Sequence, residues 1–125
     1  MKAWLWIGLA GMAGAGCRFL FSLVVAEAHF PWATFAVNLI GSFLLCYLVG
    51  GVLQRWTSRK EVQDAITTGF LGSFTTFSAL GMEVILLMEE GRFGLAALYV
   101  AVSLIGGLAA GAAGFYLSRK REECI

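Results

Sequence analysis

Residues 69–83 place polar and flexible residues inside a stretch that is otherwise apolar enough to cross a membrane. The segment reads GFLGSFTTFSALGME and contains three glycines, two threonines, two serines and a carboxylate. Backbone N–H and C=O groups must be paired in the hydrocarbon core, so a non-helical segment survives there only beside protein or a water-filled path. The segment therefore predicts a break in a membrane helix, with an ion or solute site near mid-membrane.

Phe77 follows Thr75 and Thr76 in this segment, so its ring is expected beside irregular backbone. The edge of an aromatic ring carries partial positive charge, and an anion can lie against it without a full cationic partner. The default role of a phenylalanine in such a chain is lipid contact or core packing. Its position makes Phe77 a candidate for contact with an anion.

Two rows of residues four apart lie on other apolar stretches. They consist of Thr34, Asn38 and Ser42 in one stretch, and of Tyr99, Ser103 and then Gly107 in another. Residues at this spacing share one face of a helix. Hydroxyl and amide donors on such a face can replace the hydration shell of a small anion. The same groups can instead tie helices together, and for Asn38 both interpretations stay open.

Two ionisable side chains fall within the apolar stretches. Arg18 lies about eight residues inside one end of the first stretch, or ~12 Å deep at the rise of a helix. It is a candidate for a vestibule that attracts anions, with snorkelling or pairing to Glu83 of a neighbouring subunit as alternatives. Glu83 repels anions, so either its oxygens compete with an anion for donors such as Thr34, or it is a structural acid near a helix end.

The composition indicates an integral membrane protein. The chain has 125 residues, of which 59% are hydrophobic and 14% charged, and its mean hydropathy is +0.81. These values exclude an ordinary soluble domain. Four apolar stretches near the ~20 residues of a membrane-spanning helix cover residues 3–26, 33–53, 65–88 and 93–117. Arg18 argues against a cleavable leader, and the three cysteines have no disulfide or zinc spacing.

The charges between the stretches predict an orientation. The side that carries both termini and the second loop holds Lys2, Arg55, Arg59, Lys60, Arg119, Lys120 and Arg121. The opposite side carries only Arg92, so both termini are expected in the cytoplasm. Small-residue tracks, such as Gly107 with Gly111, favour an oligomer, although they can also pack the helices of one chain.

These residues carry a resemblance to a known family. The strings GFLGSFTTFS, AGMAGAGCRF, FPWATFAVNLIGSF and ALYVAVS together resemble the CrcB (Fluc) family of fluoride-selective channels. The resemblance covers essentially the whole chain. Its most specific parts are TTFS after a G-x-x-G and an asparagine within VNxxGSF.

The resemblance implies an all-α membrane protein that forms an antiparallel, dual-topology dimer in the cell membrane of a bacterium. Each subunit has four transmembrane helices, the third broken near 72–78. The dimer conducts fluoride passively through two narrow pores, without a catalytic step, and so gives fluoride resistance. Its only cofactor is a structural sodium ion that is not transported, held by the backbone carbonyls of Gly72 and Thr75 from both subunits.

The family's remaining site residues map onto this sequence by the same resemblance. They are the pore asparagine and phenylalanine Asn38 and Phe77, the polar track Ser78, Tyr99 and Ser103, the pair Thr34 and Glu83, and the vestibule arginine Arg18. Leu80 stands where the family has a second phenylalanine, and Gly107 where it has a third hydroxyl. Half of the aromatic box is therefore missing from this chain.

Alternatives remain at two levels. The charge bias favours a heterodimer with an oppositely inserted homologue, whereas acidic neighbours of the basic residues soften the bias and leave the homodimer first. A proton-coupled multidrug exporter of similar size would use Glu83 for coupling, but such exporters usually carry their acid in the first helix, where this chain has Arg18. An accessory subunit of a larger membrane complex is the third possibility.

Overall fold

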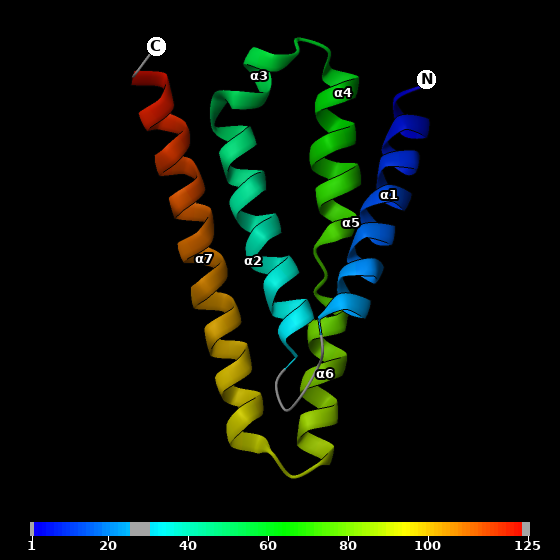
Figure 1. Cartoon of the computed structure of the whole chain (residues 1–125), viewed down its shortest axis with the longest axis vertical. Coiled ribbons are helices and arrows are strands. Elements are labelled where there is room, and N and C mark those ends of the chain that lie inside the picture. Colours follow the sequence, from blue (N-terminus) through cyan, green and yellow to red (C-terminus); the bar gives the residue numbers. More distant parts are fainter. Residues whose placement is uncertain (1, 26–30, 124–125) are drawn as a thin grey trace.

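The computed structural model describes residues 2–25 and 31–123, and over these ranges it is helical, with no strand. Four helical spans are long and apolar enough to cross a membrane: Ala3–Val24, Trp32–Trp56, Lys60–Glu89 and Phe93–Arg121. They run side by side, and each span runs in the opposite direction to the one before it in sequence, as Figure 1 shows. The predicted all-α membrane fold with four spans is confirmed for this part of the chain.

The spans are built from shorter elements. The first is α1 (Ala3–Val24); the second joins α2 (Trp32–Tyr47), the π-helical η1 (Leu48–Val52) and α3 (Leu53–Trp56); the third joins α4 (Lys60–Asp64), the π-helical η2 (Ala65–Leu71), α5 (Gly72–Phe74) and α6 (Ser78–Glu89); the fourth is α7 (Phe93–Glu123). The third and fourth spans extend beyond their predicted apolar stretches because charged residues with high helix propensity continue them. The predicted end of the first helix, residue 26, lies outside the described residues.

The third span is interrupted where the sequence predicts. α5 ends at Phe74, Thr75 takes an extended conformation with φ −82° and ψ 156°, and α6 begins at Ser78. Gly72, the first residue of the predicted break, has helical angles of φ −62° and ψ −32°. The break therefore begins three residues later than that expectation, at a threonine.

The second span turns sharply near its end. Gly51 has a φ of 129°, a conformation that favours glycine, and α3 leaves the direction of α2 at this point (Figure 1). The start of α1, the end of α7 and the connection between α3 and α4 lie at the same end of the structure (Figure 1). The basic residues that the sequence assigns to one side of the membrane therefore lie at one end of the structure.

Glycines allow helices of the same chain to approach closely. A Cβ at Gly14 of α1 would collide with the Phe70 carbonyl of η2, and one at Gly114 of α7 with the Phe43 carbonyl of α2. A Cβ at Gly111 would lie 3.1 Å from the Cys46 sulfur of α2. The glycines of α7 that suggested an oligomer thus pack α7 against α2, as in the alternative interpretation, and give no support of their own to a dimer.

Candidate functional site

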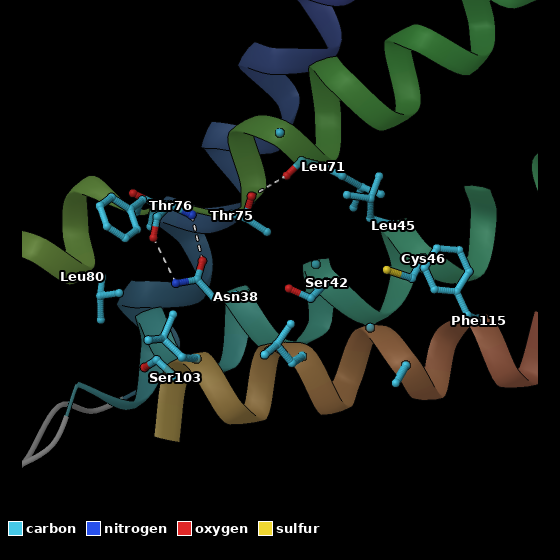
Figure 2. A pocket seen from close by; sticks show the side chains of 18 residues that line it. Asn38, Ser42, Leu45, Cys46, Leu71, Thr75, Thr76, Leu80, Ser103 and Phe115 are labelled. Carbon is cyan, nitrogen blue, oxygen red and sulfur yellow. Dashed lines mark hydrogen bonds between the residues drawn. The ribbon is translucent and has the colours of Figure 1, made fainter. Parts of the chain in front are cut away.

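Asn38 of α2 pairs with the broken backbone of the third span. Its Nδ2 donates to the Thr76 carbonyl at 3.0 Å, and its Oδ1 accepts from the Thr76 amide at 2.8 Å (Figure 2). An asparagine amide matches a peptide group in this way because it offers one donor and one acceptor side by side. These two bonds support the interpretation that Asn38 ties helices together. Among the described residues, the second N–H of Nδ2 has no acceptor.

The break diverts two backbone amides away from helical bonding. In a continuous helix, Thr76 and Ala79 would donate to the carbonyls of Gly72 and Thr75. Here the Thr76 amide bonds Asn38, and the Ala79 amide donates to Thr76 Oγ1 at 3.2 Å. The carbonyls of Gly72 and Thr75 have thus lost their helical donors. They are the two carbonyls to which the family resemblance assigns a cation.

Thr34, Glu83 and Tyr99 form a second polar group between α2, α6 and α7. Thr34 Oγ1 donates to Glu83 Oε1 at 2.5 Å, and Tyr99 OH donates to Glu83 Oε2 at 3.3 Å. Tyr99 is 0% exposed and Thr34 8% exposed. The carboxylate is thus paired with hydroxyl donors inside the chain, which lowers the cost of keeping it at membrane depth.

A groove of about 680 Å³ runs between α2, α7 and the break (Figure 2). Here "the groove" means the pocket whose polar lining residues are Asn38, Ser42, Cys46, Thr75, Thr76 and Ser103. Gly72, Phe77, Leu80 and Gly107 also border it. The Ser103 hydroxyl is buried and has no hydrogen-bond partner among the described residues. Its proton therefore has no acceptor within the described chain.

Phe77 and Leu80 differ in their surroundings although both border the groove. Phe77 is 80% exposed within the single chain, so its ring is free to face an ion or a partner. Leu80 is buried and packs in a cluster with Leu87, Ala96 and Tyr99. The residue at the position of the second box phenylalanine therefore fills the core between α6 and α7.

Ser78 and Arg18 do not line the groove themselves. Ser78 is exposed at the start of α6, with its hydroxyl 3.2 Å from Thr76 Oγ1. Arg18 is half-buried on α1, which packs chiefly against η2 and α5. The structure thus gathers Asn38, Ser103, Phe77, Gly72 and Thr75 at the groove and joins Thr34, Glu83 and Tyr99 nearby. Ser78 meets the groove only through Thr76, and Arg18 belongs to neither group.

Sequence reasoning missed two residues that shape the site. Thr76 supplies the backbone that Asn38 holds and the hydroxyl that accepts from Ala79. Gly41 lies against Thr75, because a Cβ at residue 41 would collide with the Thr75 methyl group. Gly41 follows Asn38 by three residues, on the same face of α2, and this spacing was the available signal.

Acidic, histidine and cysteine side chains do not form a metal site in the part of the chain that is described. No group of three such residues is close enough to hold an ion there. A cation near the break would therefore depend on backbone carbonyl and hydroxyl oxygens, which suit hard ions such as sodium.

The fold and the site define a multi-pass membrane protein in which Asn38 holds a helix break beside a largely apolar groove that carries a few hydroxyl and amide groups. The family model described as CrcB-like protein, Camphor Resistance (CrcB), matches residues 5–115. The chain belongs to this family, and it is a protein of the cell membrane.

Curated relatives match almost end to end. The chain is 47% identical over 123 residues to "Fluoride-specific ion channel FluC 2" of Geobacillus kaustophilus, with 95% of each protein covered. It is 46% identical to "Fluoride-specific ion channel FluC 1" of Desulfitobacterium hafniense, over 90% of this chain and 99% of the relative. A "Fluoride-specific ion channel FluC" of Chlorobaculum tepidum is also 46% identical, over 87% of this chain and 88% of the relative.

Proposed function

We propose that this chain is the subunit of a fluoride-specific channel that exports fluoride passively and gives fluoride resistance. The observation that best supports this proposal is the helix break that Asn38 holds beside the Ser103 hydroxyl, which has no partner among the described residues. The relatives that match the chain over almost their full lengths are named as fluoride channels. Those relatives are channels and not enzymes, and no catalytic step is part of the proposal.

Fluoride selectivity follows from the cost of removing water. Fluoride is small and strongly hydrated, so it enters a narrow path only where oriented donors replace its water. The Ser103 hydroxyl, the spare Asn38 N–H and the edge of the Phe77 ring meet this need at the groove. Larger anions gain less from the same donors. Glu83, held by Thr34 and Tyr99, competes with the ion for these hydroxyls and releases them as the ion moves.

The working unit in this proposal is an antiparallel homodimer. The groove and the exposed Phe77 leave one side of the chain without cover, and a two-fold partner would place a second copy of the same face against it. Such a dimer turns two grooves into two pores. Arg18 would then attract anions to a vestibule. A heterodimer with an oppositely inserted homologue is the alternative, favoured by the charge bias and by the leucine at position 80.

A structural sodium ion is part of the same proposal. The carbonyls of Gly72 and Thr75 have lost their helical donors, and two chains would supply four such oxygens near the dimer axis. The residues present therefore fit a hard monovalent cation. A bound sodium ion would supply positive charge that holds the two breaks together.

Fluoride efflux tests the function directly. The purified chain is reconstituted into liposomes loaded with potassium fluoride, valinomycin is added, and an external electrode records fluoride. We expect rapid fluoride efflux, with little efflux of chloride in matched liposomes. Proton-driven uptake of a lipophilic cation would support the exporter instead, and the absence of any transport would support the accessory subunit.

Topology and cation binding are tested separately. In a chain whose native cysteines are serine, Ser58→Cys and Glu90→Cys are labelled with an impermeant maleimide in sealed vesicles. Dual topology predicts partial labelling of both sites, whereas labelling of one site alone supports fixed insertion and a different partner. For the cation, sodium should raise the unfolding temperature in detergent more than potassium does at equal ionic strength, and equal effects would contradict a sodium site.

A further inference from the structure

Residues of α2 and α7 face each other in a constant register. Thr34 and Tyr99 bond the same Glu83 carboxylate. Two turns further along, a Cβ at Gly107 would lie 3.9 Å from Ser42 Oγ, and beyond it a Cβ at Gly111 would lie 3.1 Å from Cys46 Sγ. Each facing pair is separated by the same number of residues in sequence, so Asn38 and Ser103 occupy the level between them, and both border the groove.

Successive levels of this ladder are four residues apart, or about 6 Å along the helices. At the first two levels both helices supply a polar side chain. At the third level α7 has Gly107, and the only side chain of the pair is Ser42 of α2. The series of donors on α7 therefore stops at Ser103, while the series on α2 continues for one more turn.

We propose that Ser42 is a selectivity-determining residue of the pore, whose hydroxyl binds the dehydrated anion at the level of Gly107. The inference rests on the proposed fluoride function and adds a residue that the family resemblance does not assign. The ion path would pass from donors on both helices, at Asn38 and Ser103, to a donor on α2 alone.

The surroundings of Ser42 support a ligand role. Its side chain borders the groove (Figure 2), and Ser42 makes no hydrogen bond within residues 2–25 and 31–123. A serine within a helix commonly bonds the carbonyl one turn earlier, so a hydroxyl left without that bond keeps its proton for another acceptor. A Cβ at residue 107 would lie 3.9 Å from this hydroxyl, an ordinary contact distance, so the glycine leaves a gap there that a methyl group would fill.

The experiment compares three variants of the full chain in the liposome assay. Ser42→Ala removes the donor and Ser42→Thr keeps a hydroxyl. The double variant Ser42→Ala with Gly107→Ser moves the hydroxyl to the facing helix, where the 3.9 Å spacing leaves room for a side chain. Ser22→Ala is the matched control, because Ser22 is an exposed serine of α1 that bonds the Phe19 carbonyl.

We expect fluoride efflux by Ser42→Ala to be about tenfold slower or more, since a hydrogen bond to a charged group is lost. Ser42→Thr should keep most of the rate, the double variant should recover it, and Ser22→Ala should match wild type. The unfolding temperature in detergent should be unchanged in the Ser42 variants, because Ser42 has no partner within the described chain.

The outcomes separate this inference from the proposed function. Wild-type protein without fluoride efflux would overturn the function. Wild-type efflux that persists at full rate in Ser42→Ala would overturn only the role of Ser42. A slow Ser42→Ala that also unfolds at lower temperature and is not rescued by Gly107→Ser would assign Ser42 to helix packing, and it would equally overturn the inference.

Discussion

The amide of Asn38 and the backbone of Thr76, 38 residues apart in sequence, satisfy each other through two hydrogen bonds of 3.0 and 2.8 Å. Neither group has water to replace this partner inside a bilayer. The pair therefore lets the third span leave helical geometry at mid-membrane. It also keeps the carbonyls of Gly72 and Thr75 out of helical bonding, because the amide that would pair with Gly72 is already used.

Asn38→Leu should remove both bonds while keeping a similar volume. Two buried backbone groups then lose their partner, at a cost of about 1–3 kcal/mol each. We expect a lower unfolding temperature in detergent and loss of fluoride efflux. Gln54→Leu is the control, since Gln54 is exposed at the end of the second span. An Asn38→Leu protein as stable as this control would contradict the role assigned to the pair.

The sequence predicted the break but not the means of holding it. Threonine and serine within GFLGSFTTFS indicated irregular backbone, because such residues are rare in lipid without a purpose. The bond partners depend on how α2 lies against the third span, and helical spacing within one stretch does not contain that information. For the same reason the sequence left two roles open for Asn38, and it placed the start of the break at residue 72 when the extended residue is Thr75.

Spacing was most informative where two rows face each other. The sequence predicts both rows, on α2 and on α7, but their mutual register follows from how the two helices pack, as at Gly107 and Gly111. Leu80 is the opposite case. Its position beside Phe77 suggested a defective aromatic box, whereas the structure uses it as core between α6 and α7. Contacts with a partner chain depend on a second molecule, so the spacing within one sequence does not predict them.

Thr34→Val removes the hydroxyl of Thr34 and keeps a side chain of similar shape. Valine is close in size but leaves Glu83 Oε1 without the donor that lies 2.5 Å away. A hydrogen bond to a charged group contributes about 1.5–3 kcal/mol, so we expect slower fluoride efflux and a moderately lower unfolding temperature. Thr34→Ser keeps the donor and serves as the control. Equal efflux from both variants would mean that the contact has no part in conduction.

Phe77→Ile should affect transport without affecting stability. The Phe77 side chain is 80% exposed within the chain, so its loss costs little packing, whereas isoleucine has no ring edge to offer an anion. We expect near-complete loss of fluoride efflux with an unchanged unfolding temperature of the subunit. Phe93→Ile, at a phenylalanine that is 61% exposed at the start of α7, should leave efflux intact. Normal efflux from Phe77→Ile would assign this ring to lipid or to the dimer contact.

Gly14→Ala should disrupt the packing of the first span on the third. A Cβ at this position would collide with the Phe70 carbonyl, which belongs to the backbone and has no alternative rotamer. The two helices must then move apart, and membrane helices depend on such close contacts because lipid provides no hydrophobic drive between them. Gly16→Ala is the control on the same helix, since a Cβ there would meet nothing within 4 Å. We expect a clearly lower unfolding temperature for Gly14→Ala. Gly16→Ala should not lower the unfolding temperature, because alanine has a higher helix propensity than glycine. Equal stabilities would show that α1 and η2 are not held at the spacing described, and the break that η2 leads into would lose its support from α1.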